Sequence, residues 1–158
     1  MTLVHDILEL DLLTLQAHTE RAGDVVDADL HRARVQDMLE TCTVCPVYRA
    51  GRLVAYAALV PESASCWFVR GFNTHPSHRT SAVMGELLSK LSELARQREI
   101  VELRTHVYKT NALSMAFHKK LGFHITRENE KAVEFFAVVA MIRERRAVRR
   151  AAARVSRA

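Results

Sequence analysis

The sequence contains little of what marks several large classes of protein. Its five glycines and three prolines exclude a collagen-like or low-complexity chain. Three cysteines are too few for a disulfide-stapled domain and favour a reducing compartment, so we expect a cytoplasmic protein. The longest apolar stretch, residues 132–142, is interrupted by Glu134 and is too short to cross a bilayer. The first fifteen residues carry three acidic side chains and no basic leader, unlike a secretion signal.

Positive charge is concentrated at the C-terminus. The net charge is +5, and residues 143–158 hold seven arginines against one glutamate, which leaves about −1 for residues 1–142. We therefore predict one domain, residues 1–142, followed by an Arg-rich tail, residues 143–158, that is either helical or disordered. The body offers no basic face for nucleic acid. The tail is either a contact for nucleic acid or another acidic partner, or simply a solvated chain end.

Hydrophobic periodicity predicts an α/β protein. Leu8, Leu12, Leu13 and Leu15 recur at roughly helical spacing, whereas the chain after Cys42 alternates as strands do. The Ala50-Gly51 pair reads as a hairpin turn. In order, we predict two helices in the first 41 residues, strands at 43–48, 53–60 and 66–74, a helix at 81–96, a strand at 100–107, a helix at 111–120 and strands at 123–126 and 132–141.

The first segment that carries chemistry is residues 74–84. A strand ends at Pro76, a polar turn follows, and a helix begins at Ser81. The first turn of a helix leaves backbone N–H groups unpaired, and together with the helix dipole they form a site for phosphate groups. The cationic Arg79 and the small Ala82 suit such a site, although many strand-turn-helix units share these features.

The second segment, residues 111–123, again follows a predicted strand. Together the two segments resemble the GNAT superfamily of acyl-CoA N-acyltransferases, over roughly residues 25–141. The resemblance implies a mixed, mostly antiparallel sheet of six to seven strands, splayed between two parallel strands and flanked by about four helices. The residues of the second segment that fit the family's late motif are Asn111, Ser114, Phe117, Lys120, Gly122 and Phe123.

The resemblance implies acetyl-CoA, or another acyl-CoA, as co-substrate. Its pyrophosphate would lie on the backbone N–H groups of residues 79–84, and its pantetheine arm would pair with the end of the third strand. Asn111 would hold the start of the late helix and approach the cofactor. The implied cofactor-binding residues are Phe72, Thr74, Arg79, Thr80, Ser81, Ala82, Val83, Met84 and Asn111.

Three residues depart from the family's pattern. Ala82 is a mild change, but Met84 is bulkier than the usual glycine or alanine and would crowd the pyrophosphate unless its side chain points into the core. His118 stands where the family often has a tyrosine that protonates the departing thiolate. Because histidine also acts as a general acid, the resemblance implies that His118 is the catalytic residue that protonates or hydrogen-bonds the CoA sulfur. The alternative is a surface histidine without a catalytic role.

The implied function is an N-acetyltransferase in which a primary amine attacks acetyl-CoA directly in a ternary complex. The amine must first lose a proton, and the candidate bases near the sheet are Glu62, His75, Glu102 and His106. Arg70 occupies the strand position where relatives place a base, and would instead contact an acidic substrate. A backbone N–H near Phe72 would polarise the thioester oxygen.

Two other functions stay open at this point. The chain could be a non-catalytic GNAT-like module that binds acyl-CoA or regulates a partner, or an interaction protein that acts through its basic tail. Cys42 and Cys45 form a CxxC pair, but it ends a predicted helix rather than opening one and lacks further ligands at zinc-like spacing, so we expect no metal. The apolar last strand, Val133–Met141, is either internal or pairs across a homodimer. No motif in the sequence indicates which amine is the acceptor.

Overall fold

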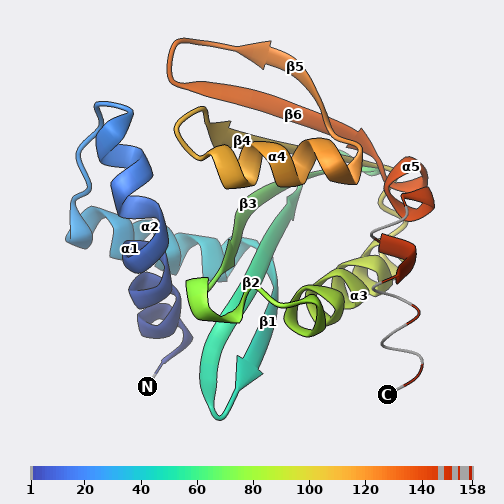
Figure 1. Cartoon of the computed structure of the whole chain (residues 1–158), viewed down its shortest axis with the longest axis horizontal. Helices are drawn as coiled ribbons and strands as arrows, with labels where there is room; N and C mark the ends of the chain where they lie inside the picture. Colours follow the sequence, from blue (N-terminus) through green and yellow to red (C-terminus); the bar gives the residue numbers. More distant parts are fainter. Residues whose placement is uncertain (1, 146–147, 151–152, 154–156, 158) are drawn as a thin grey trace.

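The computed structural model describes residues 2–145, 148–150, 153 and 157. Helices and strands alternate as the sequence predicts, and Figure 1 shows them around one central sheet. In chain order the elements are α1 (Leu3–Arg21), α2 (Ala28–Thr41), β1 (Thr43–Arg49), β2 (Arg52–Pro61), β3 (Cys66–Thr74), the 3-10 turn η1 (Pro76–His78), α3 (Ser81–Gln97), β4 (Glu102–Tyr108), α4 (Ala112–Leu121), β5 (His124–Glu128), β6 (Ala132–Val138) and α5 (Val139–Glu144).

Local sequence chemistry sets several element ends. Asp27 caps α2, because its carboxylate accepts hydrogen bonds from the backbone N–H groups of Asp29 and Leu30. Ala50 and Gly51 both have positive φ, the geometry of the tight turn that joins antiparallel strands. Gly122 ends α4 in the left-handed conformation, with φ of 104°.

The six strands form one sheet in the order β1-β2-β3-β4-β6-β5. The β3–β4 pair is parallel, and every other pair is antiparallel. This arrangement confirms the predicted mixed, mostly antiparallel sheet. The predicted last strand is internal, because β6 lies between β4 and β5.

The two parallel strands separate partway along their length. They pair from Cys66 opposite Glu102 to Val69 opposite Thr105, and no further. Arg70 is an extra residue in β3, since Val69 and Gly71 pair with consecutive residues of β2. Such a bulge bends a strand. Beyond it, as far as Thr74, none of the described strands pairs with this edge of β3.

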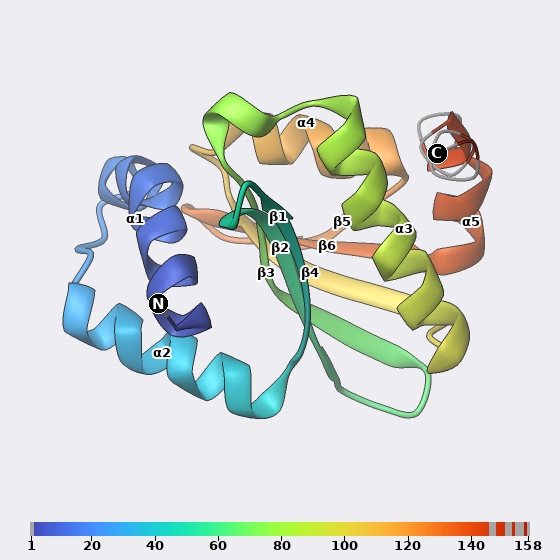
Figure 2. The same cartoon turned by 90° about the horizontal axis from the view of Figure 1, so that it is seen from below.

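Helices cover both faces of the sheet. Figure 2 shows α1 and α2 on one side and α3 and α4 on the other. Strand β2 is buried against both layers: Tyr56 and Ala58 pack with α1 and α2, whereas Val54 and Ala57 pack with α3. This explains why the sequence of β2 is continuously apolar instead of alternating.

The prediction of a strand through residue 141 is wrong at its end. Strand β6 stops at Val138, where its partner β4 begins with Glu102, so no strand is available for further pairing. The chain turns into α5 instead. The predicted boundary after residue 142 falls inside this helix, and Val148 packs in the core beside Phe135. Half of the predicted tail lies outside the described residues, so the domain division and the tail's partner stay predictions.

None of the described helices has both the length and the apolar character needed to cross a membrane.

Candidate active site

Two adjoining chambers lie where β3 and β4 separate, each with a volume of about 320 Å³. The first, the α3 chamber, lies between β3, the start of α3 and α4. The second, the α2 chamber, lies between α1, α2, β3 and β4. The α3 chamber is lined by Thr74, Arg79, Thr80, Ser81, Met84 and Phe117, among others. The α2 chamber is lined by Asp11, His31, Arg34, Arg70, His106 and His118, among others. Both are bordered by Leu15, His18, Phe72, Asn111 and Ser114.

The edge of β3 supplies backbone groups to this site. The N–H of His75 bonds to the carbonyl of Val54 on β2, at 2.7 Å. Because N–H directions alternate along a strand, the N–H groups of Thr74 and Phe72 point to the opposite, unpaired edge. The Asn73 side chain already accepts from the Thr74 N–H at 2.8 Å. Phe72 therefore offers the open backbone edge in the middle of the site.

The start of α3 supplies a second set of backbone groups. Three N–H groups in the predicted phosphate-binding stretch are already bonded: Thr80 to the His78 carbonyl, Val83 to the Thr80 hydroxyl, and Met84 to the Thr80 carbonyl. We find no such partner among the described residues for the N–H groups of Arg79, Ser81 and Ala82. These three groups surround the N-terminus of a 17-residue helix, where the helix dipole favours an anion.

Two neighbouring residues of α3 point in different directions. Val83 is buried in the core between α3 and the sheet. Met84 is half-buried and lines the α3 chamber. The sequence left open whether Met84 points into the core or toward the pyrophosphate, and the structure has it on the chamber wall.

Helix α4 begins beside both chambers. The Asn111 side chain caps it by accepting from the Ser114 N–H at 3.1 Å, as the sequence predicts for the start of this helix. One turn later, the ring of Phe117 stacks on Phe72 of β3, with 5.3 Å between centroids. These contacts fix α4 against the open edge of β3.

His118 is buried, with 5% of its surface exposed, so the alternative of a surface histidine is wrong. Its ring stacks on Phe135 at 5.3 Å, and its Nδ1–H donates to the Ser114 carbonyl at 2.7 Å. Burial lowers the pKa of His118 more than the carbonyl hydrogen bond raises it. A neutral ring bonded in this way carries no proton on Nε2. Donation of a proton from Nε2 therefore requires the imidazolium form, which burial disfavours.

A buried carboxylate forms one wall of the α2 chamber. Asp11 of α1 is 4% exposed. Its Oδ1 accepts from the Tyr56 hydroxyl at 2.7 Å and from the Asn73 amide at 3.0 Å, and its Oδ2 lies 2.9 Å from Nε2 of His31. Burial is the largest cause of a raised Tyr56 pKa, and Asp11 adds to it, so the hydroxyl keeps its proton and donates it.

His18 lies on the wall that the two chambers share. Its Nδ1 accepts from the Arg21 guanidinium at 2.6 Å. Burial and the nearby charges of Arg21 and Arg79 lower its pKa, while a hydrogen bond to the Thr110 backbone raises it. The acceptor nitrogen of His18 is therefore already occupied.

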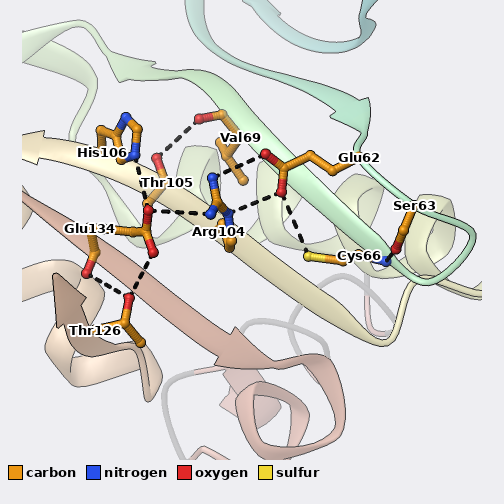
Figure 3. Close-up of polar contacts among 9 residues, drawn as sticks. All are labelled: Glu62, Ser63, Cys66, Val69, Arg104, Thr105, His106, Thr126 and Glu134. Carbon is orange, nitrogen blue, oxygen red and sulfur yellow. Dashed lines mark hydrogen bonds and ion pairs between the residues drawn. The ribbon is translucent and has the colours of Figure 1, made fainter.

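Of the four candidate bases, only His106 borders either chamber. Figure 3 shows its ring beside Glu134, with Nε2 to Oε2 at 3.3 Å. Glu62 lies farther along the sheet and is bound to Arg104. Glu102 is at the closed end of the β3–β4 pair. His75 lines a separate small cavity with Glu9 and Arg52.

Arg70 projects from the bulge of β3 into the wall of the α2 chamber. Its guanidinium donates to the Asp37 carboxylate at 2.8 Å and to the Thr41 hydroxyl at 3.0 Å. The Asp37 hydrogen bond is the largest cause of its raised pKa. One side of Arg70 is thus anchored to α2 on the wall of the α2 chamber.

The CxxC pair has no catalytic geometry. Cys42 follows α2, and Cys45 is buried in β1, where burial raises the pKa of its thiol. Within the part of the chain that the structure describes, no three His, Cys, Asp or Glu side chains come together as metal ligands.

Sequence reasoning missed the contribution of the first two helices. Asp11, Thr14 and His18 are polar, yet they follow one another at helical spacing along the face of α1 that also carries the buried Ile7. That pattern was the available signal. No such signal in the sequence pointed to its partner His31, because His31 lies twenty positions farther along the chain in another helix.

The comparisons with known proteins agree with this architecture. No curated protein matches the sequence. Among solved structures, the fold is similar to aminoglycoside 6'-acetyltransferase type Ii, with 16% identity, a TM-score of 0.67 and coverage of 86% of this chain and 89% of that one. It is also similar to the PaiA N-acetyltransferase of Thermoplasma acidophilum in complex with coenzyme A, with 11% identity, a TM-score of 0.68 and coverage of 85% of this chain and 92% of that one. A third similar structure is the ribosomal-protein-alanine N-acetyltransferase of Brucella melitensis, with 19% identity, a TM-score of 0.58 and coverage of 86% of this chain and 94% of that one.

A family model matches residues 5–123, which include α1, α2, the splayed strands, α3 and α4. This match extends over most of the chain and over all of the residues that border the two chambers. The chain therefore belongs to the acetyltransferase (GNAT) family.

Proposed function

We propose that this protein is an acetyl-CoA-dependent N-acetyltransferase in which a primary amine attacks the thioester directly in a ternary complex. The supporting observation is that the open edge of β3 and the unpaired N–H groups at the start of α3 face the same chamber. The first would pair with the amides of the pantetheine arm, and the second would bind the pyrophosphate. The thioester would then lie near Phe72, where the two chambers meet.

The residues of the α3 chamber would divide the work of binding. Arg79 would add charge to the backbone N–H groups, and Asn111 would hold α4 at the cofactor. The Phe72 N–H would polarise the thioester oxygen as negative charge develops on it. The full set of proposed cofactor-binding residues is Phe72, Thr74, Arg79, Thr80, Ser81, Ala82, Val83, Met84 and Asn111.

The α2 chamber would hold the acceptor amine. Its charged wall residues are Arg34, Arg70 and Asp11, and the Asp11 oxygens already accept from three neighbouring side chains. A polycation would find no available carboxylate among these groups. The arginines favour an amine that carries a neutral or an anionic group near its nitrogen.

The binding step is tested by calorimetry with acetyl-CoA and CoA. We expect saturable binding, and we expect Met84→Trp to weaken it at least tenfold by filling the α3 chamber. Met141→Trp is the matched control, because Met141 is exposed and borders neither chamber. Equal binding by the two variants would contradict the assignment of the α3 chamber to the cofactor.

The transfer step is tested with a matched amine series and a free-thiol readout. Hexylamine, aminohexanoate and diaminohexane share a chain length but end in a methyl group, a carboxylate and a second ammonium. We expect the diamine to be the poorest acceptor. Binding of acetyl-CoA without transfer to any primary amine would favour the second candidate, a non-catalytic acyl-CoA-binding module, for which the bulky Met84 on the chamber wall is the structural argument.

A further inference from the structure

His31 and Asp11 form a histidine–carboxylate pair on the wall of the α2 chamber. The two residues come from different helices, and His31 Nε2 lies 2.9 Å from Asp11 Oδ2. The carboxylate cannot turn freely, because Tyr56 and Asn73 donate to its other oxygen. It is almost completely buried, whereas 27% of the His31 side chain is exposed. The pair thus has a fixed inner end and an accessible outer end.

The hydrogen bond sets the tautomer of His31. A carboxylate only accepts hydrogen bonds, so the ring must carry its proton on Nε2 when it is neutral. Nδ1 is then the basic nitrogen, and it makes no hydrogen bond to the described residues. A buried carboxylate that holds a histidine in one tautomer also stabilises the imidazolium that forms when the ring takes a proton.

We propose that His31 is the general base that deprotonates the acceptor amine, with Asp11 as its positioning residue. This inference rests on the proposed function. A proton passes from the acceptor ammonium to Nδ1 of His31, directly or through one water. The free amine then forms the C–N bond to the acetyl carbon, and the C–S bond breaks. The thiolate leaves with the bonding electron pair and takes up the proton that the new amide nitrogen loses, directly or through water. The imidazolium of His31 returns its own proton to solvent.

The other histidines that border this chamber suit the role less well. The acceptor nitrogen of His18 is occupied by Arg21. His118 is buried against Phe135. His106 is 58% exposed, and its carboxylate, Glu134, is shared with Arg104 and Thr126.

Charged groups face the chamber of His31 from three elements. Asp11 of α1 is the anion, and Arg34 of α2 and Arg70 of β3 are the cations. The remaining titratable groups on the chamber wall come from α1, β2, β4 and α4: His18, Tyr56, His106, Tyr108 and His118.

The test compares three variants. His31→Gln keeps an N–H donor for Asp11 but has no basic nitrogen. Asp11→Asn removes the charge that positions the ring. His124→Gln makes the same exchange at an exposed histidine of β5 that borders neither chamber. We expect acetyl-CoA affinity to stay within twofold of wild type in all three, which shows that the α3 chamber is intact.

Turnover should separate these variants. With aminohexanoate at pH 7, we expect His31→Gln to lower kcat by about 100-fold, the size of a lost general base. We expect the kcat of the wild type to rise with pH through an inflection, and we expect this variant to lack that inflection. Asp11→Asn should move that inflection to lower pH, and His124→Gln should change kcat less than threefold.

The outcomes separate this inference from the proposed function. Wild-type protein that transfers no acetyl group to any amine overturns both. Active wild type with a fully active His31→Gln variant overturns only the base. Nitrogen NMR of His31 adds a readout that does not depend on turnover: we expect a proton on Nε2, the nitrogen that faces Asp11, and a ring protonated on Nδ1 alone would also overturn the base.

Discussion

The ring of Tyr56 lies directly against the backbone of Gly71, so that a Cβ on residue 71 would be 2.7 Å from Tyr56 Cε2 and 3.1 Å from its hydroxyl. The ring is buried, and its hydroxyl is held by Asp11 at 2.7 Å, so it has little room to move aside. Gly71 follows the bulge at Arg70. The missing side chain at residue 71 therefore lets Tyr56 reach the buried carboxylate beneath the open edge of β3.

This packing predicts the effect of Gly71→Ala. The new methyl group overpacks the space occupied by the Tyr56 ring, and we expect the free energy of unfolding to fall by about 1–3 kcal/mol. Urea unfolding, followed by far-UV circular dichroism, measures the change. A variant as stable as the wild type would mean that the ring has space to shift while keeping its hydrogen bond.

Tyr56→Phe tests the hydrogen bond itself. Losing a donor to a buried carboxylate should lower the free energy of unfolding by about 1.5–3 kcal/mol. Tyr108→Phe is the matched control, because Tyr108 also donates to a carboxylate at 2.7 Å, that of Asp24, but Asp24 is more exposed and has Lys131 as a second partner. The control should lose less than about 1 kcal/mol. Equal losses in the two variants would contradict the special role of the buried site.

The parts of the fold that the sequence predicted well are those with local causes. The turn at Ala50-Gly51, the apolar stripe of α3 and the stop of α4 at Gly122 all follow from residues close together in the chain. The family's two motifs likewise lie within short segments. These segments are sufficient to predict the α3 chamber.

The α2 chamber could not be predicted in the same way. It depends on Asp11 meeting Tyr56, Asn73 and His31 across 45, 62 and 20 positions of the chain. Helical spacing alone also did not tell which side of α1 is buried, since the helix turns Ile7 and Leu10 toward its neighbours and leaves Leu13 exposed. The end of β6 depends on where its partner β4 begins.

Burial of His118 predicts how stability changes with pH. Because its pKa is lowered from 6.5 in the folded state, the unfolded chain binds a proton that the folded chain resists. The contribution of neutral His118 to the free energy of unfolding is fully present above pH 6.5, the pKa of the ring in the unfolded chain. It is lost as the pH falls from there toward the lower pKa of the ring in the folded chain. We expect His118→Phe to reduce this loss between pH 7 and pH 5, measured by urea unfolding at each pH. His75, whose pKa burial also lowers, contributes to the slope that remains. A slope unchanged by His118→Phe would contradict the prediction.

The proposed catalytic role of His118 makes a separate prediction about rate. If Nε2 gives a proton to the departing thiolate, only the imidazolium form is active, so the contribution of His118 to kcat must fall as the pH rises through its lowered pKa. The ratio of wild-type kcat to that of His118→Phe isolates this contribution from the opposing effect of amine deprotonation. We expect the ratio to exceed ten at pH 6 and to decline by pH 8, while the ratio for His78→Asn, outside both chambers, stays near one. A ratio near one at every pH would mean that solvent protonates the sulfur, and that the histidine stacked on Phe135 serves only to hold α4 against the sheet.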